Sequence, residues 1–310
     1  MLRIADGATR RGGDPAMVRV AGRLVFTVGV AFLAAAALGH PGAGIIVDAQ
    51  GDVIFTDTGG GIWKIDGHGQ LTRTSKYAYH WIALDKEGAF SDTNHSLYRR
   101  LTPRGTKPAL LIGDDRPIVI GRDGNMYHAA CHYSGPLLVT RVEPGGGTFV
   151  LAQVPGNDYT TRICPVNGIA VAADGAIYFS EMQTVTKVSK EGAVAGVFGP
   201  ITVPECAAVP GVSEGLKPYL RGLDVGSDGS VYVAASGCGA VLKISPSGTI
   251  TTILKANSPW SPTAVALGGS DLYVLEYLHT TGKNPRDWLP RVRKLAADGT
   301  VTVLATVSRH

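Results

Sequence analysis

Four polar side chains stand at equivalent places in the sequence, each immediately before a short apolar run: His80, Arg116, Asn167 and Arg221. Arginine offers a planar fork of donors, asparagine offers a donor and an acceptor, and histidine titrates near neutral pH. Such a set suits a carboxylate, sulfate or phosphate. In an enzyme, His80 would act as a general base, and the other three would stabilise developing negative charge.

A second group of polar and aromatic residues follows one strand further along each segment. Carboxylates at strand ends and amphipathic rings near loops are typical of small-molecule or peptide binding sites. We expect ligand-binding roles for Asp57, His128, His132, Glu181, Glu276, Tyr277 and Trp260. The alternative is structural, because the acids could pair with the arginines and fill the site.

The elements that must position these residues are repeated hairpins. The stretch NGIAVAADGAIYFSE, from Asn167, contains two strands joined by an Asp-Gly turn, and similar copies begin at Gly44, His80, Arg116, Arg221 and Pro262. A second glycine-turn hairpin follows each copy, which gives four strands in about forty residues. This period predicts an all-β, six-bladed propeller with four antiparallel strands per blade over residues 40–310.

The connections indicate which end of the propeller carries function. Glycine turns are tight, whereas the connections 154–166, 199–220 and 277–290 are long and fall at the opposite end. Long loops on a scaffold of short ones commonly carry binding or catalysis. We therefore expect the site at this loop-rich end.

Two segments carry a family resemblance. GIIVDAQGDVIFTDTGGGIWKID resembles an NHL repeat, and VNGIAVAADGAIYFSE is similar to the inner hairpin of the gluconolactonase and senescence-marker-protein superfamily. The resemblance extends from about Gly44 to the C-terminus and implies a six-bladed propeller. It also implies a lactonase- or esterase-type hydrolase or a lyase as one functional alternative.

The superfamily's metal ring is altered here. Its members hold a divalent cation with Glu, Asn and Asp, and of these ligands only Asn167 is present, with Ala43 and Arg221 at the other places. Arginines near the ring would repel a cation, so we expect no resident cofactor. Calcium remains an alternative. Zinc is another, because the related peptidyl-hydroxyglycine amidating lyase binds zinc with ring histidines and His80 stands at such a position. His128, His132 and His279 lie on second strands or in the loops after them and could approach it.

The four cysteines all fall at the loop-rich end. In an exported chain an even number suggests disulfides, and pairing of neighbours would join Cys131 to Cys164 and Cys206 to Cys238.

Residues 1–39 are expected to be an N-terminal extension with a cleaved signal peptide. Arg19 and Arg23 precede an uncharged run from Leu24 to Leu38, which is too short to span a bilayer stably. Met17 is an alternative start. We expect a secreted or periplasmic protein without a stable membrane span after cleavage.

The charge gives no reason to expect nucleic acid as a partner. The formal net charge is +4, but the first 39 residues contribute most of the excess, and the remainder is nearly neutral without a Lys/Arg run. The sequence therefore favours a monomeric exported propeller that binds a small anionic molecule or a peptide. The enzyme described above is the alternative.

Overall fold

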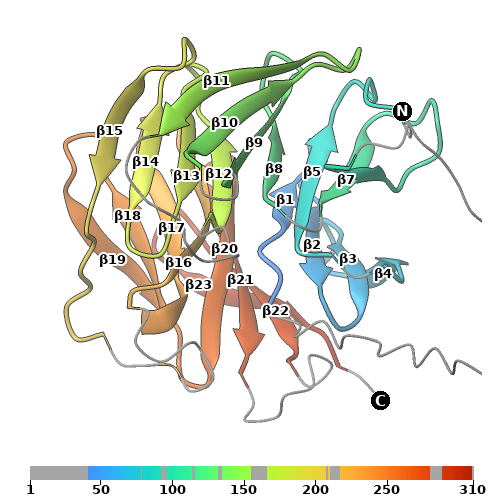
Figure 1. The fold of residues 1–310 in the computed structure, drawn as a ribbon. Coiled ribbons are helices and arrows are strands. Elements are labelled where there is room, and N and C mark those ends of the chain that lie inside the picture. Colours follow the sequence, from blue (N-terminus) through green and yellow to red (C-terminus); the bar gives the residue numbers. More distant parts are fainter. Residues whose placement is uncertain are drawn as a thin grey trace, which may run out of the picture. The chain divides into compact units, whose positions relative to one another are not determined.

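The computed structural model describes residues 41–77, 79–91, 96–113, 116–131, 135–154, 166–206, 209, 217–279 and 288–308. These residues form six antiparallel sheets, and the sheets are the blades of a propeller (Figure 1). The first three blades contain β1 (Ile45–Val47), β2 (Val53–Asp57), β3 (Gly61–Ile65), β4 (Leu71–Ser75); β5 (Trp81–Asp85), β6 (Arg99–Arg100), β7 (Ala109–Gly113); and β8 (Ile118–Ile120), β9 (Met126–Cys131), β10 (Leu137–Val142), β11 (Thr148–Val154). The last three contain β12 (Gly168–Val171), β13 (Ile177–Ser180), β14 (Val185–Val188), β15 (Val194–Phe198); β16 (Leu220–Val225), β17 (Val231–Ala235), β18 (Ala240–Ile244), β19 (Ile250–Lys255); and β20 (Trp260–Gly268), β21 (Asp271–Leu278), β22 (Pro290–Leu295), β23 (Val301–Thr306).

The predicted six-bladed, all-β propeller is confirmed. Five sheets have four strands in sequence order, and the inner strands β1, β5, β8, β12, β16 and β20 lie side by side in a ring that closes between β20 and β1. The last blade contains only C-terminal strands, so the ring closes by packing and not by strand exchange, as expected.

The second blade departs from the expected hairpin. We expected Trp81–Asp85 to pair with the segment after Gly88, but β5 pairs instead with β7, and Trp81 lies opposite Gly113. All five residues of β7 are buried, and this apolar strand fills the place next to the inner strand better than a polar segment does. This sheet has three strands within the described part of the chain, in the order β5-β7-β6.

Carboxylates organise many of the glycine turns. In the hairpin of the fourth blade, Asp174 accepts a hydrogen bond from the Ala176 amide at 3.0 Å, and the Gly175 amide donates to the Ala172 carbonyl at 3.0 Å. Gly175 has a φ of 85°, a left-handed conformation that glycine adopts without strain. The Asp-Gly pairs therefore fix these turns as the sequence predicts.

The core lies between blades. Each of six apolar clusters joins two neighbouring blades, and the cluster between the last and first blades includes Phe55, Tyr277 and Val292, all with 0% exposure. Burial of apolar surface between sheets thus stabilises the ring at every junction.

Among the described residues there is no helix of the length and hydropathy needed to cross a membrane. The predicted signal peptide and extension, residues 1–39, lie outside the described residues.

Candidate functional site at the loop-rich end

The segment Pro41–Gly44 lies across the loop-rich end of the ring. The Ala43 amide donates to the His80 carbonyl at 2.9 Å, and the Pro41 carbonyl accepts a hydrogen bond from Nη2 of Arg221. His80 belongs to the second blade and Arg221 to the fifth, so the segment connects blades on opposite sides of the ring. It covers the position at which the sequence placed the polar ring.

Small residues allow this close approach. A Cβ at Gly42 would overlap Oγ1 of Thr56 and lie 3.1 Å from the Tyr277 hydroxyl oxygen. The Tyr277 hydroxyl in turn donates to the Thr56 carbonyl at 2.8 Å. Burial raises the pKa of Tyr277, so this hydroxyl remains a neutral donor.

Arg221 is nearly buried, with 4% of its surface exposed. Its guanidinium lies 5.9 Å from the centre of the Tyr219 ring, and burial lowers its pKa. Nε of Arg221 has no hydrogen-bond partner among the described residues. The side chain therefore keeps donor capacity beyond its contact with Pro41.

His279, directly after β21, lies within the electrostatic reach of Arg221. It is 6% exposed, and burial together with the positive charge of Arg221 lowers the pKa of His279 to about 4. Neither ring nitrogen has a partner within the described parts of the chain, and the ring lies 5.9 Å from that of Trp288. At neutral pH, His279 is thus an uncharged imidazole that can accept a proton. The sequence suggested His279 only as an alternative zinc ligand.

The remaining ring residues occupy separate positions. Nδ2 of Asn167 donates to the Leu220 carbonyl at 3.0 Å, which places Asn167 beside the strand that carries Arg221. His80 contacts the Trp81 ring edge-on at 5.4 Å. Arg116 is half-buried in the segment before β8.

The three acids have different partners. Asp57 accepts from the Gly59 amide at 3.1 Å and from Nε1 of Trp63 at 3.3 Å, while the Thr184 hydroxyl lies 3.4 Å from a Glu181 oxygen. Glu276 pairs with two arginines of β22 that the sequence did not single out: Nε of Arg291 at 2.6 Å and Nη1 of Arg293 at 3.0 Å. Glu276 is thus paired with arginines, as the structural alternative expects of an acid, but these arginines are not ring residues.

The other expected ligand-binding residues are also placed by packing. Trp260 lies under the Arg291 guanidinium, at 4.0 Å from its ring centre, and His128 is buried in β9 opposite Thr140. His132 lies outside the described residues. Ligand binding by these residues stays a prediction.

The cysteine pairing is confirmed for one bridge. Cys206 and Cys238 form a disulfide with a Cα–Cα distance of 4.8 Å, and Cys238 ends the short 3₁₀ helix Ser236–Cys238. Cys131 is disulfide-bonded, but Cys164, its expected partner, lies outside the described residues.

A metal ion does not fit the ring as described. Among the described residues, no group of three or more His, Cys, Asp and Glu side chains is arranged to hold a metal. The side-chain amide nitrogen of Asn167 donates a hydrogen bond to the Leu220 carbonyl. The guanidinium of Arg221 occupies a place where the resemblance implies a carboxylate. A cationic group at that place opposes a divalent ion.

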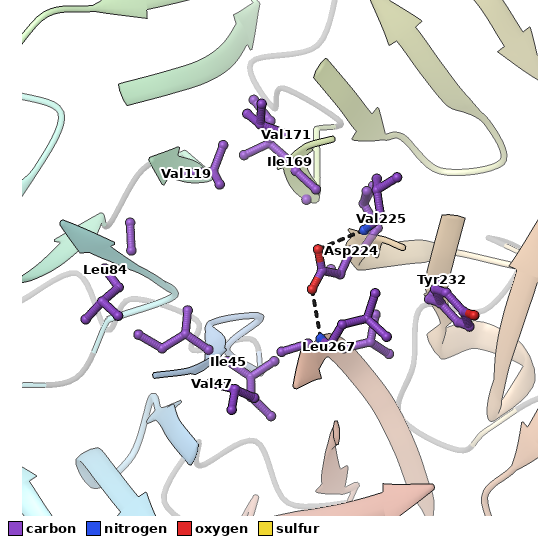
Figure 2. Close-up of a pocket in the computed structure, with 18 of the residues that line it drawn as sticks. Ile45, Val47, Leu84, Val119, Ile169, Val171, Asp224, Val225, Tyr232 and Leu267 are labelled. Carbon is purple, nitrogen blue, oxygen red and sulfur yellow. Dashed lines mark hydrogen bonds between the residues drawn. The ribbon is translucent and has the colours of Figure 1, made fainter. Parts of the chain in front are cut away.

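A cavity of about 770 Å³ lies inside the ring of inner strands (Figure 2). Its wall extends from Ala43 and Gly168, near the strand starts, to Asp228 and Ser270 beside the glycine turns. Asp224 on β16 contributes a carboxylate to this wall. The sequence carried a signal for it, because Asp224 interrupts the apolar pattern of its inner strand.

The fold and this geometry define a six-bladed propeller of four-stranded blades with a polar loop-rich end. Neither a protein-family model nor a curated protein matches the sequence. Solved propeller structures do match: a luciferin-regenerating enzyme (16% identity, TM-score 0.53, covering 86% of this chain and 92% of that one) and regucalcin, a calcium-binding protein from Agrobacterium tumefaciens (16%, 0.51, 78% and 83%). A gluconolactonase from Xanthomonas campestris matches with 14% identity and a TM-score of 0.50, over 76% of this chain and 84% of that one. At these identities the likeness establishes the fold.

Proposed function

We propose that the chain is an enzyme of the hydrolase or lyase type, acting on a lactone, an ester or a related carbonyl compound at the loop-rich end. The observation that carries the proposal is that Arg221 and His279 are both buried and lie within electrostatic reach of each other. A buried cation within electrostatic reach of an uncharged imidazole supplies the two groups that such a reaction needs, a site for negative charge and a base.

The roles follow from the chemistry of each group. His279 accepts a proton from water in a hydrolysis, or from a substrate carbon in an elimination, because its low pKa keeps it uncharged at neutral pH. Arg221 stabilises the oxygen on which negative charge develops. The Pro41 carbonyl oxygen, which accepts from Arg221, stands where an oxygen of the substrate would bind.

Access requires a change at the loop-rich end. Arg221 and His279 are 4% and 6% exposed, so the segment Pro41–Gly44 must yield its contact with Arg221 when a substrate enters. Asn167, whose amide group donates to the Leu220 carbonyl, and His80, whose carbonyl accepts from the Ala43 amide, are proposed to orient the substrate.

Two further considerations support the reading. The fold is shared with a gluconolactonase, so the scaffold accommodates reactions of cyclic esters, although fold alone does not assign a reaction. Hydrolysis of a lactone releases a carboxylate, and this product is the kind of small anion that the sequence predicts as a ligand.

The Cys206–Cys238 disulfide supports a secreted or periplasmic location.

The test is turnover of a panel of γ- and δ-lactones and aryl esters, followed in ¹⁸O-labelled water. Hydrolysis would place ¹⁸O in the product carboxylate, whereas elimination would not. We expect His279→Gln and Arg221→Gln to lower kcat/KM by at least about 100-fold. The exposed His68 provides a matched control, since His68→Gln should leave turnover unchanged.

Two results would decide against the proposal. Undiminished turnover in folded His279→Gln would remove the proposed base, and His80→Ala and Asn167→Ala would then identify whether the ring carries the reaction. Saturable binding of carboxylates without turnover of any substrate would instead support a binding protein.

A further inference from the structure

The central cavity offers a second candidate site, which extends from the loop-rich end, at Ala43 and Gly168, toward the glycine turns. Most side chains of its wall are apolar residues of the inner strands, although more of the accessible lining surface is polar than apolar, and Figure 2 shows Val47, Leu84, Val119 and Val171 arranged around the space. A volume of about 770 Å³ lies in the range of pockets that enclose a small organic molecule. The lining thus suits a ligand that combines an apolar body with a polar group.

One ionisable group interrupts this apolar wall. Asp224 is the only acidic or basic lining residue among those described that is not exposed, because Lys86, Arg122 and Asp228 lie exposed beside the glycine turns. Asp224 makes no ion pair with any residue in the described ranges, and burial raises its pKa. An unpaired carboxylate in apolar surroundings is costly unless something compensates it.

The hydrogen bonds of Asp224 leave room for a ligand. One carboxylate oxygen accepts from the Val225 amide and the other from the Leu267 amide, each at 2.8 Å (Figure 2). A carboxylate oxygen has two lone-pair directions, so each retains acceptor capacity. The hydrogen bond from the Leu267 amide to Asp224 also joins the sixth blade to the fifth. An uncharged acceptor could make this bond, so the bond does not explain why the residue is an acid.

We propose that the central cavity binds a small molecule with an apolar body and one amine or ammonium group, which pairs with the Asp224 carboxylate. The apolar strands surround the body of the ligand, and Asp224 fixes its charged end. The site is independent of the Arg221–His279 chemistry, since Arg221 lies at the loop-rich start of β16 and Asp224 lies further along the same strand.

Calorimetric titration with n-octylammonium tests this site, with 1-octanol and octanoate as probes of similar length. We expect octylammonium to bind with a submillimolar Kd, and both other probes to bind at least about tenfold more weakly. Asp224→Asn, which keeps the shape of the side chain, should weaken octylammonium binding by at least about tenfold.

Two more variants separate the cavity from its rim. Asp228→Asn removes an exposed carboxylate of the same lining, one that pairs with Lys243 at 3.5 Å, and should change the Kd less than about twofold. Val171→Phe narrows the cavity while retaining Asp224, and should also weaken binding by at least about tenfold. Thermal melts would verify that each variant is folded.

The proposal is overturned by any of four results. Octanol could bind as tightly as octylammonium, folded Asp224→Asn or Val171→Phe could keep the wild-type Kd, or Asp228→Asn could lose binding as Asp224→Asn does. Absence of octylammonium binding at millimolar concentration would overturn it as well.

Discussion

The Tyr277 hydroxyl donates a hydrogen bond of 2.8 Å to the Thr56 carbonyl, and this bond joins the last blade of the propeller to the first. Both residues have 0% exposure. The two blades share no strand, so their junction depends on side-chain packing and on this bond.

Tyr277→Phe should therefore lower the free energy of unfolding by about 1 to 3 kcal/mol, because it deletes a buried hydrogen bond without removing the ring. Chemical denaturation would measure the loss. Tyr98→Phe is the matched control: its hydroxyl donates to the Ser91 carbonyl at 3.1 Å within one blade and is only partly buried. An equal loss in both variants would show that the junction has no special weight.

Arg100 should be the residue on which the second blade depends most. Its guanidinium donates to five carbonyls, those of Gly88, Phe90, Thr102, Pro103 and Thr106, at 2.7 to 3.2 Å. Arg100→Met keeps much of the apolar stem but leaves these carbonyls without their donor, and we expect a loss of about 3 kcal/mol or more.

The neighbouring Arg99 provides the control for Arg100. Arg99 is exposed, and its guanidinium lies 5.9 Å from the Tyr77 ring. Arg99→Met should change stability by less than about 1 kcal/mol. Denaturation curves of the two variants would be compared, and similar losses would contradict the assigned role of Arg100.

The sequence predicts the propeller because its signals are local. Asp-Gly turns such as Asp174-Gly175 fix hairpins between residues close in sequence, and six repeats of the same pattern leave few other ways to bury their apolar faces. The strand order of the second blade is harder to predict. There β5 pairs with β7 and not with the segment nearer in sequence, and this pairing depends on burial in the assembled blade.

The site was less predictable than the fold. Comparison of the six repeats within the sequence identified Arg221 as a ring residue. It could not show that Pro41 covers this guanidinium or that His279 lies near it. Glu276 was recognised as a strand-end acid, whereas its pairing with Arg291 depends on the register between β21 and β22. Contacts between blades are set by packing that no local pattern encodes.

His279 should make stability depend on pH. Its pKa is about 4 in the folded protein and near 6.5 when unfolded. The unfolded state therefore gains a proton first as pH falls, so the free energy of unfolding should decrease between pH 6.5 and pH 4, by on the order of 3 kcal/mol in total. Above pH 6.5 this group contributes no pH dependence.

Denaturation at a series of pH values would measure this effect. His279→Gln should flatten the difference between pH 6.5 and pH 4, whereas His68→Gln, at an exposed turn, should follow the wild-type curve. If His279→Gln and wild type showed parallel curves, His279 would not be held uncharged by burial and by Arg221.

Gly222 should tolerate no side chain, because the inner strands of neighbouring blades approach closely there. A Cβ at Gly222 would lie 2.5 Å from the Ala264 Cβ, 2.9 Å from the Ala264 Cα and 3.2 Å from the Ala43 carbonyl oxygen. Gly222→Ala should lower stability by about 1 to 3 kcal/mol, since backbone atoms of two blades would have to move. Gly196→Ala, on the outer strand β15, is the matched control: its Cβ would meet nothing within 4 Å, so it should leave stability unchanged or raise it slightly. If Gly222→Ala and Gly196→Ala had the same free energy of unfolding, the ring would not be closely packed next to Arg221. The segment Pro41–Gly44 would then have no tightly packed strands beneath it.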